Sequence, residues 1–502
     1  MFVDTLDLDD QSTIECDIAI IGAGMAGICL AREFAGSGLS VSLLESGGEK
    51  PDSQTDAFSA GSTTIFGPDG AEKSVDDYLQ ESRERYFGGT GNAWGGKCAY
   101  FDTHDFAERS WIPNSGWPFD AQEIKPFYDR ACHLLRIPTL TGLQSSVSGD
   151  VEHLNAQRNF ATSLRCFSGV TGKPMSDAFY DYKYGLKDVG DLTVYLHANV
   201  ACLHLDKALG RITAAEVRCL NNKQHTVKAR YFVLASGGIE NVRILMNSEG
   251  NSAGGIGNRH DLLGRFFNGH GMFRYLGGFG QAPSQVSLLN DDLNLSIYTD
   301  KNPAKTQGVF SLTYKAQWRE RVAQFAATLT PNCDGDSDDY GIDNHSDDGQ
   351  SNKLGAFFMI EQYPNRESRI RLSNDVDSLG IPAISLEWRF SSDDMKTLKK
   401  GIELFSRDLG KSGSAELLNG KVGIGIAEMI ESSRHHMGGT RMCVSDQYGV
   451  VDQDSRVHDV ENLFVAGSSI FPTGSIANPT LTILALSIRL ADHVKKLCSP
   501  TI

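Results

Sequence analysis

The sequence lacks the features of several protein classes. No apolar run approaches the ~18 residues that a membrane-spanning helix needs. The ten cysteines are scattered, with no Cys-x-x-Cys pair and no metal-ligand spacing, which is typical of reduced, mostly buried thiols. Basic residues are the minority, 47 against 63 acidic ones, and the net charge of −16 argues against nucleic-acid or anionic-membrane partners. The acidic N-terminus shows no secretory signal, so we expect a cytoplasmic protein.

The chain is long enough for more than one domain. Its 502 residues exceed the size at which a single core stops growing, so we expect at least two domains. The two ends are rich in glycine and in short apolar runs typical of parallel strands, whereas residues 280–430 alternate apolar and polar side chains, as at 368–372 and 383–388. We also predict paired strands at 192–206, and a strand, glycine turn and helix at 231–247.

Residues 17–30 (DIAIIGAGMAGICL) predict a strand, a loop and a helix. In the loop, Gly22 allows a tight turn, Gly24 lets the backbone approach a pyrophosphate, and Gly27 lets the helix pack closely on the strand. The N-terminus of the helix offers free N–H groups and the positive end of its dipole. This loop is therefore suited to hold phosphate.

An acidic residue follows at the end of the next predicted strand. The strand at 41–44 ends in Glu45, whose carboxylate can accept hydrogen bonds from the hydroxyls of an adenosine ribose and would repel a 2′-phosphate. A glycine-rich turn without a ligand is the alternative for the loop alone. The order of strand, loop, helix, strand and acid favours nucleotide binding, and leaves NAD and FAD both open.

Residues 332–352 are dense in Asp, Gly, Ser and Asn. Asp334, Asp336 and Asp338 imitate the start of a calcium loop, but Asp339 stands where that loop needs Gly and His345 where it needs a bidentate Glu. A solvated insertion is the better interpretation, and we assign no metal.

Five motifs in one order resemble the glucose-methanol-choline (GMC) family of FAD-dependent oxidoreductases. They are GAGMAG with Glu45, GGTGNAWGGKC at 88–98, ASGGIE at 235–240, HHMGGTRM at 435–442, and the tail at 462–482 with Asn478-Pro479. Within the family, residues 110–135 are similar to the corresponding segment of pyranose oxidases, sugar dehydrogenases and glycoside oxidases.

The resemblance implies an α/β fold, with a Rossmann-like FAD-binding domain plus an α+β substrate domain that contains an antiparallel sheet. We expect the FAD-binding domain to be discontinuous, at 1–105, 190–275 and 431–502. The substrate-binding domain would then take 106–189 and 276–430, with the acidic insertion near 332–352.

The resemblance also implies FAD rather than NAD, because several further glycine-rich segments are available to line a longer cofactor. Some pyranose oxidases attach FAD covalently through a His that stands at the position of Ala93, so we expect non-covalent FAD here. The implied cofactor-binding residues are Gly22, Gly24, Met25, Ala26, Gly27, Glu45, Gly89, Asn92, Ala93, Trp94, Val200 near the adenine, Ala235, Gly467, Asn478 and Thr480.

Alcohol oxidation by hydride transfer needs a base for the hydroxyl proton and a partner that orients the oxygen. His435 matches the family's His-x-x-Gly register counted back from Arg441, so we expect it to be the base, with His436 beside it as a substrate contact. The second catalytic position falls on Asn478, whose amide can donate and accept. Taken alone, the His pair is compatible with a plain loop and Asn-Pro with a plain turn.

Substrate recognition is less clearly marked. Residues 358–364 predict a strand that carries Gln362, and pyranose oxidases have a sugar-contacting Gln on a similar strand; an ordinary strand amide is the alternative. Trp94 either lines the flavin pocket or fills core. A lid from residues 274–284 and the acidic insertion is a further hypothesis.

We therefore expect an enzyme that oxidises a hydroxyl of a sugar, glycoside or related polyol to a ketone or aldehyde, with hydride passing to flavin N5. The electron acceptor is O₂ or another compound, and an oligomer is compatible with the sequence. An alcohol or sterol oxidase, a hydroxynitrile lyase with a structural flavin, and a non-catalytic flavin-binding subunit are the alternatives.

Overall fold

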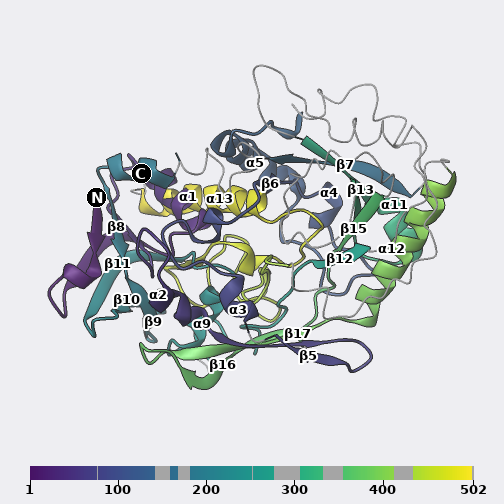
Figure 1. Ribbon diagram of the computed structural model, residues 1–502. Helices are drawn as coiled ribbons and strands as arrows, with labels where there is room; N and C mark the ends of the chain where they lie inside the picture. Colours follow the sequence, from purple (N-terminus) through teal and green to yellow (C-terminus); the bar gives the residue numbers. More distant parts are fainter. Residues whose placement is uncertain are drawn as a thin grey trace, which may run out of the picture.

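The computed structural model describes residues 1–75, 77–141, 159–167, 181, 183–251, 253–275, 306–331, 354–411 and 433–499. The acidic insertion lies outside these residues, as does all but the start of the hypothetical lid segment. Within the described chain, the strands form three sheets (Figure 1).

The largest sheet has eight strands and a mostly parallel core. The pairs that join β1, β8, β3, β2 and β11 are parallel, β18 runs parallel to the end of β11, and β10 and β9 add an antiparallel edge. In sheet order the strands are β1 (Phe2–Asp4), β8 (Leu192–Leu196), β3 (Val41–Leu44), β2 (Thr13–Ile21), β11 (Gln224–Leu234), β10 (Arg211–Arg218) and β9 (Asn199–Asp206), with β18 (Leu463–Val465) beside β11.

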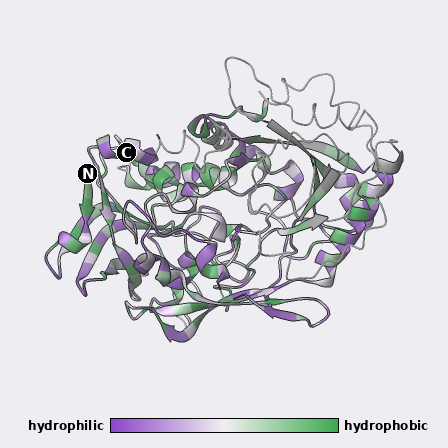
Figure 2. Cartoon of the chain, in the orientation of Figure 1, coloured by the Kyte–Doolittle hydropathy of each residue, from purple (hydrophilic) through white to green (hydrophobic). Residues whose placement is uncertain are grey.

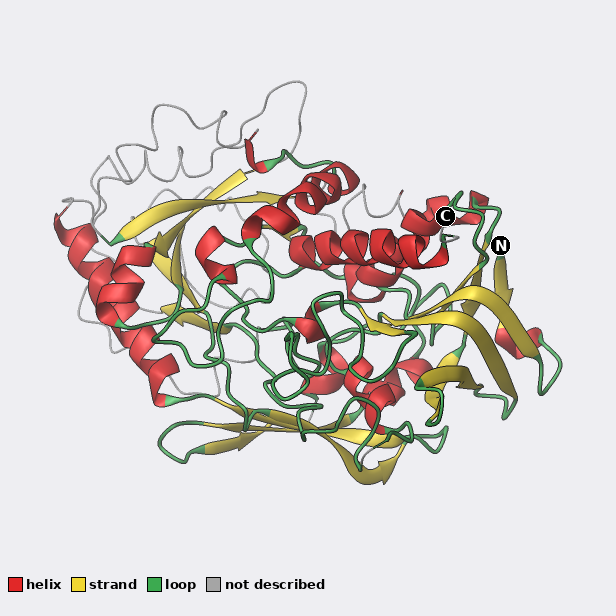
Figure 3. Ribbon diagram, turned by 180° about the vertical axis from the view of Figure 1, so that it is seen from behind, coloured by secondary structure: helices red, strands yellow, loops and turns green. Residues whose placement is uncertain are grey.

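Two helices from opposite ends of the chain pack on this sheet. Helix α1 (Met25–Phe34) and the C-terminal α13 (Thr480–Cys498) lie side by side in Figures 1 and 3 and contact each other. Their apolar faces share one core with the strands, in which Ile18, Leu30 and Leu490 are buried. Burial of such side chains stabilises the layer by about 1.5–3 kcal/mol each. The pairing joins segments that lie near the two ends of the chain.

The second sheet has six strands that are all antiparallel. In sheet order they are β12 (Gly271–Tyr275), β15 (Leu354–Ile360), β14 (Phe325–Pro331), β13 (Thr306–Leu312), β7 (Phe160–Phe167) and β6 (Lys97–Cys98).

Helix α12 (Ser392–Lys411) covers this sheet. Figure 2 shows that hydrophobic and hydrophilic residues alternate along α12, as expected of a helix with one buried face. On that face the Phe405 ring lies 5.5 to 6.0 Å from the rings of Phe160, Phe310 and Phe358, so an aromatic cluster anchors the helix.

The third sheet has four strands and runs along the lower edge of Figure 3. Its order is β16 (Arg369–Val376), β17 (Pro382–Arg389), β4 (Gly61–Phe66) and β5 (Glu72–Ser74). The remaining α-helices of the described chain are α2 (Ser53–Asp56), α3 (Tyr78–Glu81), α4 (Thr103–Phe106), α5 (Ala121–Leu135), α9 (Glu240–Met246) and α11 (Tyr314–Glu320).

Most predicted elements are confirmed, including the strand, turn and helix of 231–247 and the strands at 368–372 and 383–388. The prediction of paired strands at 192–206 was wrong in one respect. Both strands form, but β8 pairs in parallel with β1 and β3, whereas β9 pairs with β10. Only tertiary contacts decide which strands pair, because the same short strand sequence can form part of either a hairpin or a parallel sheet.

The predicted domain boundaries stay a prediction. Three strands from the predicted FAD-binding segments pair with strands of the predicted substrate-binding domain. They are β6 and β12, which join the six-stranded sheet, and β4, which pairs in parallel with β17. The thiols follow the expectation where they are described: all nine cysteines there are free, and Cys333 lies outside. No helix in the described part of the chain has the length and apolar character to cross a membrane.

Candidate active site

The glycine loop between β2 and α1 has the geometry of a phosphate cradle. A Cβ on Gly27 would lie 1.9 Å from the carbonyl oxygen of Gly22, so only glycine allows the helix to pack this closely. Gly22 itself has φ +104°, in the region that favours glycine. A Cβ on Gly24 would have no described heavy atom within 4 Å, which leaves its backbone open to a ligand. These environments are compatible with the three predicted roles, and the approach of a pyrophosphate to Gly24 stays a prediction.

Glu45 lies directly beneath this loop. One carboxylate oxygen accepts from the backbone N–H of Ala23 at 3.0 Å and the other from that of Gly47 at 3.0 Å. Burial raises the pKa of the Glu45 carboxyl, and the two N–H groups act in the opposite direction. The backbone carbonyl of Glu45 accepts from Ala198 N at 2.8 Å, which brings the start of β9, and Val200 on it, close to the end of β3.

The glycine-rich segment 88–98 packs on the same loop. Gly88 donates its N–H to Ala23 O at 2.9 Å, and a Cβ on Gly89 would lie 3.1 Å from Gly24 Cα. Trp94 is partly buried against the main core, and its ring nitrogen is buried with no hydrogen-bond partner in the described structure. The ring therefore packs on the core, and the flavin-lining interpretation of Trp94 stays a prediction.

A buried lysine beside this segment was not identified from the sequence. Lys183 Nζ is 2.9 Å from Asn92 Oδ1 and lies over the rings of Phe87 and Tyr184 at 5.1 and 5.0 Å. Burial lowers the pKa of Lys183 to about 8, and the charge of Glu45 opposes the shift. No motif marks this lysine, because Asn92 and Phe87 come from another part of the chain.

The tail reaches the same region through β18 and α13. Ala466 N donates to Leu234 O at 2.7 Å, and Ala235 N donates to Ile21 O at 2.7 Å, so the ends of β2, β11 and β18 lie together. A Cβ on Gly467 would meet no described atom within 4 Å, as at Gly24. Thr480 begins α13, directly after Asn478 and Pro479. Ala235 and the segment at Gly467 thus lie beside the end of β2, where the glycine loop begins.

The predicted catalytic pair also comes together. Asn478 Nδ2 lies 3.4 Å from His435 Nε2, and both side chains are partly buried. Asn478 Oδ1 is buried and has no hydrogen-bond partner in the described structure. An orphaned buried acceptor is costly unless a ligand satisfies it, so this atom points to a ligand site.

A third histidine, which sequence analysis missed, contacts this pair. His270 Nδ1 lies 2.6 Å from His435 Nδ1, and His270 Nε2 faces the carbonyl oxygens of Ser475 at 2.9 Å and Gly474 at 3.3 Å. No motif around His270 marks it as a site residue, so only its position in the folded structure identifies it.

His436 has a different environment from His435. Its Nε2 is 3.2 Å from the hydroxyl of Tyr78, which itself donates to Ser433 O at 2.7 Å, so His436 is the donor to Tyr78. Burial, with smaller contributions from the charges of Arg83 and Arg434, lowers the pKa of His436 to about 3. Such a ring stays neutral at physiological pH and is a poor acceptor for a substrate proton.

Gln362 does not lie on a strand, because β15 ends at Ile360. The cause of this correction is contact with other segments of the chain. The Gln362 amide oxygen accepts from Trp388 Nε1 at 2.8 Å and from Gly269 N at 3.2 Å, and its Nε2 donates to Arg389 O at 2.8 Å. The side chain is fully buried and bonded within the protein, which is the ordinary role weighed against sugar contact.

A buried ion pair braces the segment before Asn478. Both guanidinium Nη atoms of Arg109 donate to Glu361, at 2.7 and 2.6 Å, and both side chains are almost fully buried. Glu361 also accepts from Ser475 N at 3.3 Å, and the Ser475 hydroxyl donates to Asp105 at 2.7 Å. These hydrogen bonds therefore fix the backbone of Ser475, whose carbonyl oxygen faces His270.

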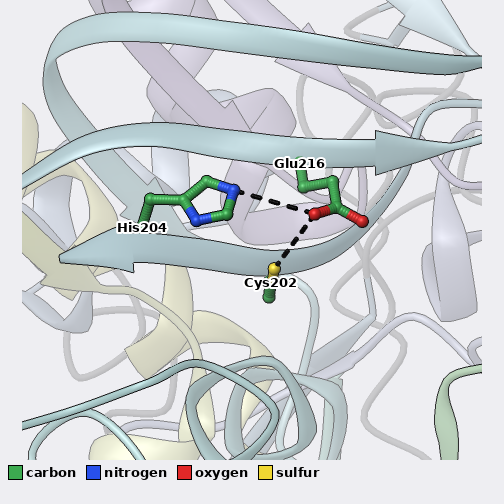
Figure 4. Close-up of side chains that lie close together, drawn as sticks. All are labelled: Cys202, His204 and Glu216. Carbon is green, nitrogen blue, oxygen red and sulfur yellow. Dashed lines mark hydrogen bonds and ion pairs between the residues drawn. The ribbon is translucent and has the colours of Figure 1, made fainter.

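Another polar cluster lies on the paired strands β9 and β10. Ligand-type atoms of Cys202, His204 and Glu216 lie within 4.8 Å of one another (Figure 4). Arg218 Nε donates to Glu216 at 2.7 Å, and burial together with Glu216 raises the pKa of Cys202 to about 11, which keeps the thiol protonated. Hydrogen bonds and the ion pair account for the cluster, and we propose no metal for it.

The glycine loop offers a prediction in which two neighbouring substitutions have different effects. Gly27→Ala should destabilise the protein without FAD by about 1–3 kcal/mol, because the new methyl group overlaps Gly22 O. Gly24→Ala should cost no more than about 1 kcal/mol of stability but weaken FAD binding, because its methyl group occupies the open space. Thermal unfolding of apoprotein and fluorescence titration with FAD separate the two. Equal FAD affinity in Gly24→Ala and the unsubstituted protein would contradict the cradle.

Comparison with known proteins agrees with this geometry. Residues 17–258 match the model of an FAD binding domain, and residues 364–487 match that of GMC oxidoreductase. Paromamine 6′-oxidase of Streptomyces fradiae is 23% identical, over 95% of this chain and 91% of its own length. C-glycoside 3-oxidase of Arthrobacter globiformis is 28% identical, over 54% of this chain and 47% of its own.

The fold is shared with solved structures. Formate oxidase of Aspergillus oryzae superposes with a TM-score of 0.64 at 14% identity, over 98% of this chain and 99% of that one. The open space at Gly24 and Gly467 and the orphaned atoms of Trp94 and Asn478 fit the binding of a flavin nucleotide. The chain therefore belongs to the GMC oxidoreductase family and is an FAD-dependent oxidoreductase that acts on CH–OH groups.

Proposed function

We propose that this enzyme oxidises a hydroxyl group of a sugar, glycoside or related polyol to a ketone or aldehyde. The observation that carries the proposal is the pairing of His435 with Asn478, whose buried amide oxygen lacks a partner in the described structure. A substrate with more than one hydroxyl can donate to that oxygen while another hydroxyl faces His435.

His435 and Asn478 have separate roles in this proposal. His435 Nε2 takes the proton of the reacting hydroxyl, because a neutral imidazole nitrogen is a base suited to neutral pH. The Asn478 amide, 3.4 Å from that nitrogen, donates to the substrate oxygen and keeps it oriented. FAD, when bound, supplies the acceptor for the two electrons that leave the carbinol carbon with its hydrogen.

We further propose that FAD is held without a covalent bond. Ala93 occupies the position at which some related oxidases carry the linking histidine, and a methyl group forms no such bond. The residues that would hold the cofactor are the loop from Gly22 to Gly27, Glu45 beneath it, the segment around Asn92, and the tail around Gly467 and Thr480. Denaturation with acid should therefore release all of the flavin into solution.

The substrate class rests on the relatives. The names of three of them describe action on paromamine, on C-glycosides and on fructose, and a fourth is named for 2-methyl-1,2-propanediol. The same names include both oxidases and a dehydrogenase, so we propose O₂ or another acceptor for the second half-reaction. The two predicted substrate contacts, Gln362 and His436, both form hydrogen bonds within the protein. We therefore propose that they support the residues of the site without contacting the substrate.

Anaerobic titration of the flavin tests the proposal. Sugars, glycosides, aminoglycosides, sterols and simple alcohols are added in turn while flavin absorbance is recorded, and we expect bleaching by polyhydroxylated rings and none by sterols. Air admitted afterwards distinguishes an oxidase from a dehydrogenase by the speed of reoxidation. Bleaching by sterols or simple alcohols alone would overturn the sugar assignment, and turnover of a hydroxynitrile without bleaching would favour the lyase.

A further inference from the structure

His270 faces His435 because two chain segments pair across the site. Asn268 and Met437 exchange both backbone hydrogen bonds, each of 2.9 Å, in an antiparallel bridge. His270 lies two residues after Asn268, and His435 lies two residues before Met437. In an antiparallel pair these two positions are opposite each other and on the same face. Their rings are 4.8 Å apart at the centroids and perpendicular, with an interplanar angle of 89°. Backbone pairing thus fixes the separation of the two imidazoles.

The hydrogen bonds of His270 determine which of its nitrogens carries a proton. Its Nε2 lies 2.9 Å from Ser475 O and 3.3 Å from Gly474 O, and carbonyl oxygens only accept hydrogen bonds. Nε2 must therefore be protonated. The side chain is fully buried. A neutral imidazole that is protonated on Nε2 bears its lone pair on Nδ1.

The same reasoning determines which nitrogen of His435 carries a proton. Because His270 Nδ1 can only accept, His435 Nδ1 at 2.6 Å must be the donor. A neutral His435 then has its lone pair on Nε2, and that nitrogen faces the amide nitrogen of Asn478, which can only donate. Each hydrogen bond along the series from Ser475 to Asn478 has one donor and one acceptor.

We propose that His270 is a positioning residue that holds His435 in the Nδ1-protonated tautomer, so that His435 Nε2 is the basic nitrogen presented to substrate. The proposal rests on the proposed role of His435 as the base. In the reaction, the hydroxyl O–H bond breaks and its proton moves to Nε2. The carbinol hydrogen would leave with the electron pair of its C–H bond, for which FAD, when bound, would supply the acceptor. His435 then carries both ring protons, and His270 still accepts from Nδ1 without moving.

The carbonyl groups behind His270 are rigid, which the proposal requires. Ser475 has φ +52°, a conformation that L-residues rarely adopt, and both its N–H and its hydroxyl are bonded, to Glu361 and Asp105. The Gly474 and Ser475 carbonyls cannot turn away without breaking these bonds. His270 is thereby prevented from exchanging its own tautomer.

Nitrogen-15 NMR of histidine-labelled protein tests the proposal in the resting enzyme. The ring signals of His435 are those lost in His435→Gln. We expect an unprotonated Nε2 in the unsubstituted protein, and a shift toward Nε2 protonation in His270→Ala, where the acceptor is gone. His270→Gln should restore the original tautomer, because its amide can accept from His435 and donate to Ser475. A protonated Nε2 in the unsubstituted protein would overturn the proposal by itself.

Kinetics supply the second measurement. His270→Ala should lower kcat by about 10-fold to 100-fold with a much smaller change in KM, since the substrate still binds but the base is in the wrong tautomer. His270→Gln should recover most of the loss at equal FAD content, which a merely space-filling role does not predict. An unchanged tautomer or an unchanged kcat in His270→Ala would refute the role of His270. Full activity of His435→Gln would instead refute the proposed base, whatever the NMR of His270 variants shows.

Discussion

Replacing His435 by alanine should lower kcat by about 10²-fold to 10⁴-fold, the usual contribution of a positioned general base. FAD should remain bound, because the cradle at Gly22 to Gly27 and Glu45 lies on separate elements. The acid side of the pH profile of kcat/KM should flatten as well, because protonation of the base no longer limits the rate. Anaerobic stopped-flow reduction of the flavin measures the loss directly, apart from the reaction with the electron acceptor.

The neighbouring histidine provides the control. His436→Asn should lower kcat by less than about 10-fold, because burial keeps that ring neutral and its Nε2 is bonded to Tyr78. Added imidazole should restore part of the rate of His435→Ala and leave His436→Asn unchanged. If the larger loss and the rescue occurred at His436 instead, the assignment of the two adjacent histidines would be reversed.

Removing one partner of the buried ion pair should have the largest effect on stability. Arg109→Met should reduce the free energy of unfolding by about 3–5 kcal/mol, because the Glu361 carboxylate stays buried without its bidentate partner. Part of the effect should reach the active site, since Glu361 also holds the backbone of Ser475. Urea unfolding followed by circular dichroism at saturating FAD measures the loss.

Two further variants show whether burial is the cause. Arg136→Met removes an exposed ion pair with Asp181, of 2.8 Å, and should cost no more than about 1 kcal/mol. The double variant Arg109→Met with Glu361→Leu should regain most of the stability, because no charge then remains uncompensated in the pair. A double variant as unstable as Arg109→Met would show that packing or the nearby Asp105, rather than the unpaired charge, dominates.

Local sequence was sufficient for the cofactor edge of the fold. The turn at Gly22 and the close packing at Gly27 are decided within a few residues of the chain, by backbone conformation and side-chain size, and Glu45 follows at the end of the next strand. The β11 to α9 turn was predictable for the same reason. Gln362 was not, because its place beyond β15 depends on Trp388 and Gly269, which come from other segments.

The sequence by itself determined the nucleotide loop, the family and the candidate pair of His435 and Asn478, because short motifs with fixed backbone requirements carry them. Only the tertiary structure decided the rest: that β8 and β9 join different partners, that Lys183 is buried beside Asn92, and that His270 faces His435. These contacts join residues far apart in the chain. Their donors and acceptors are matched by folding, and no local pattern records which partner each will meet.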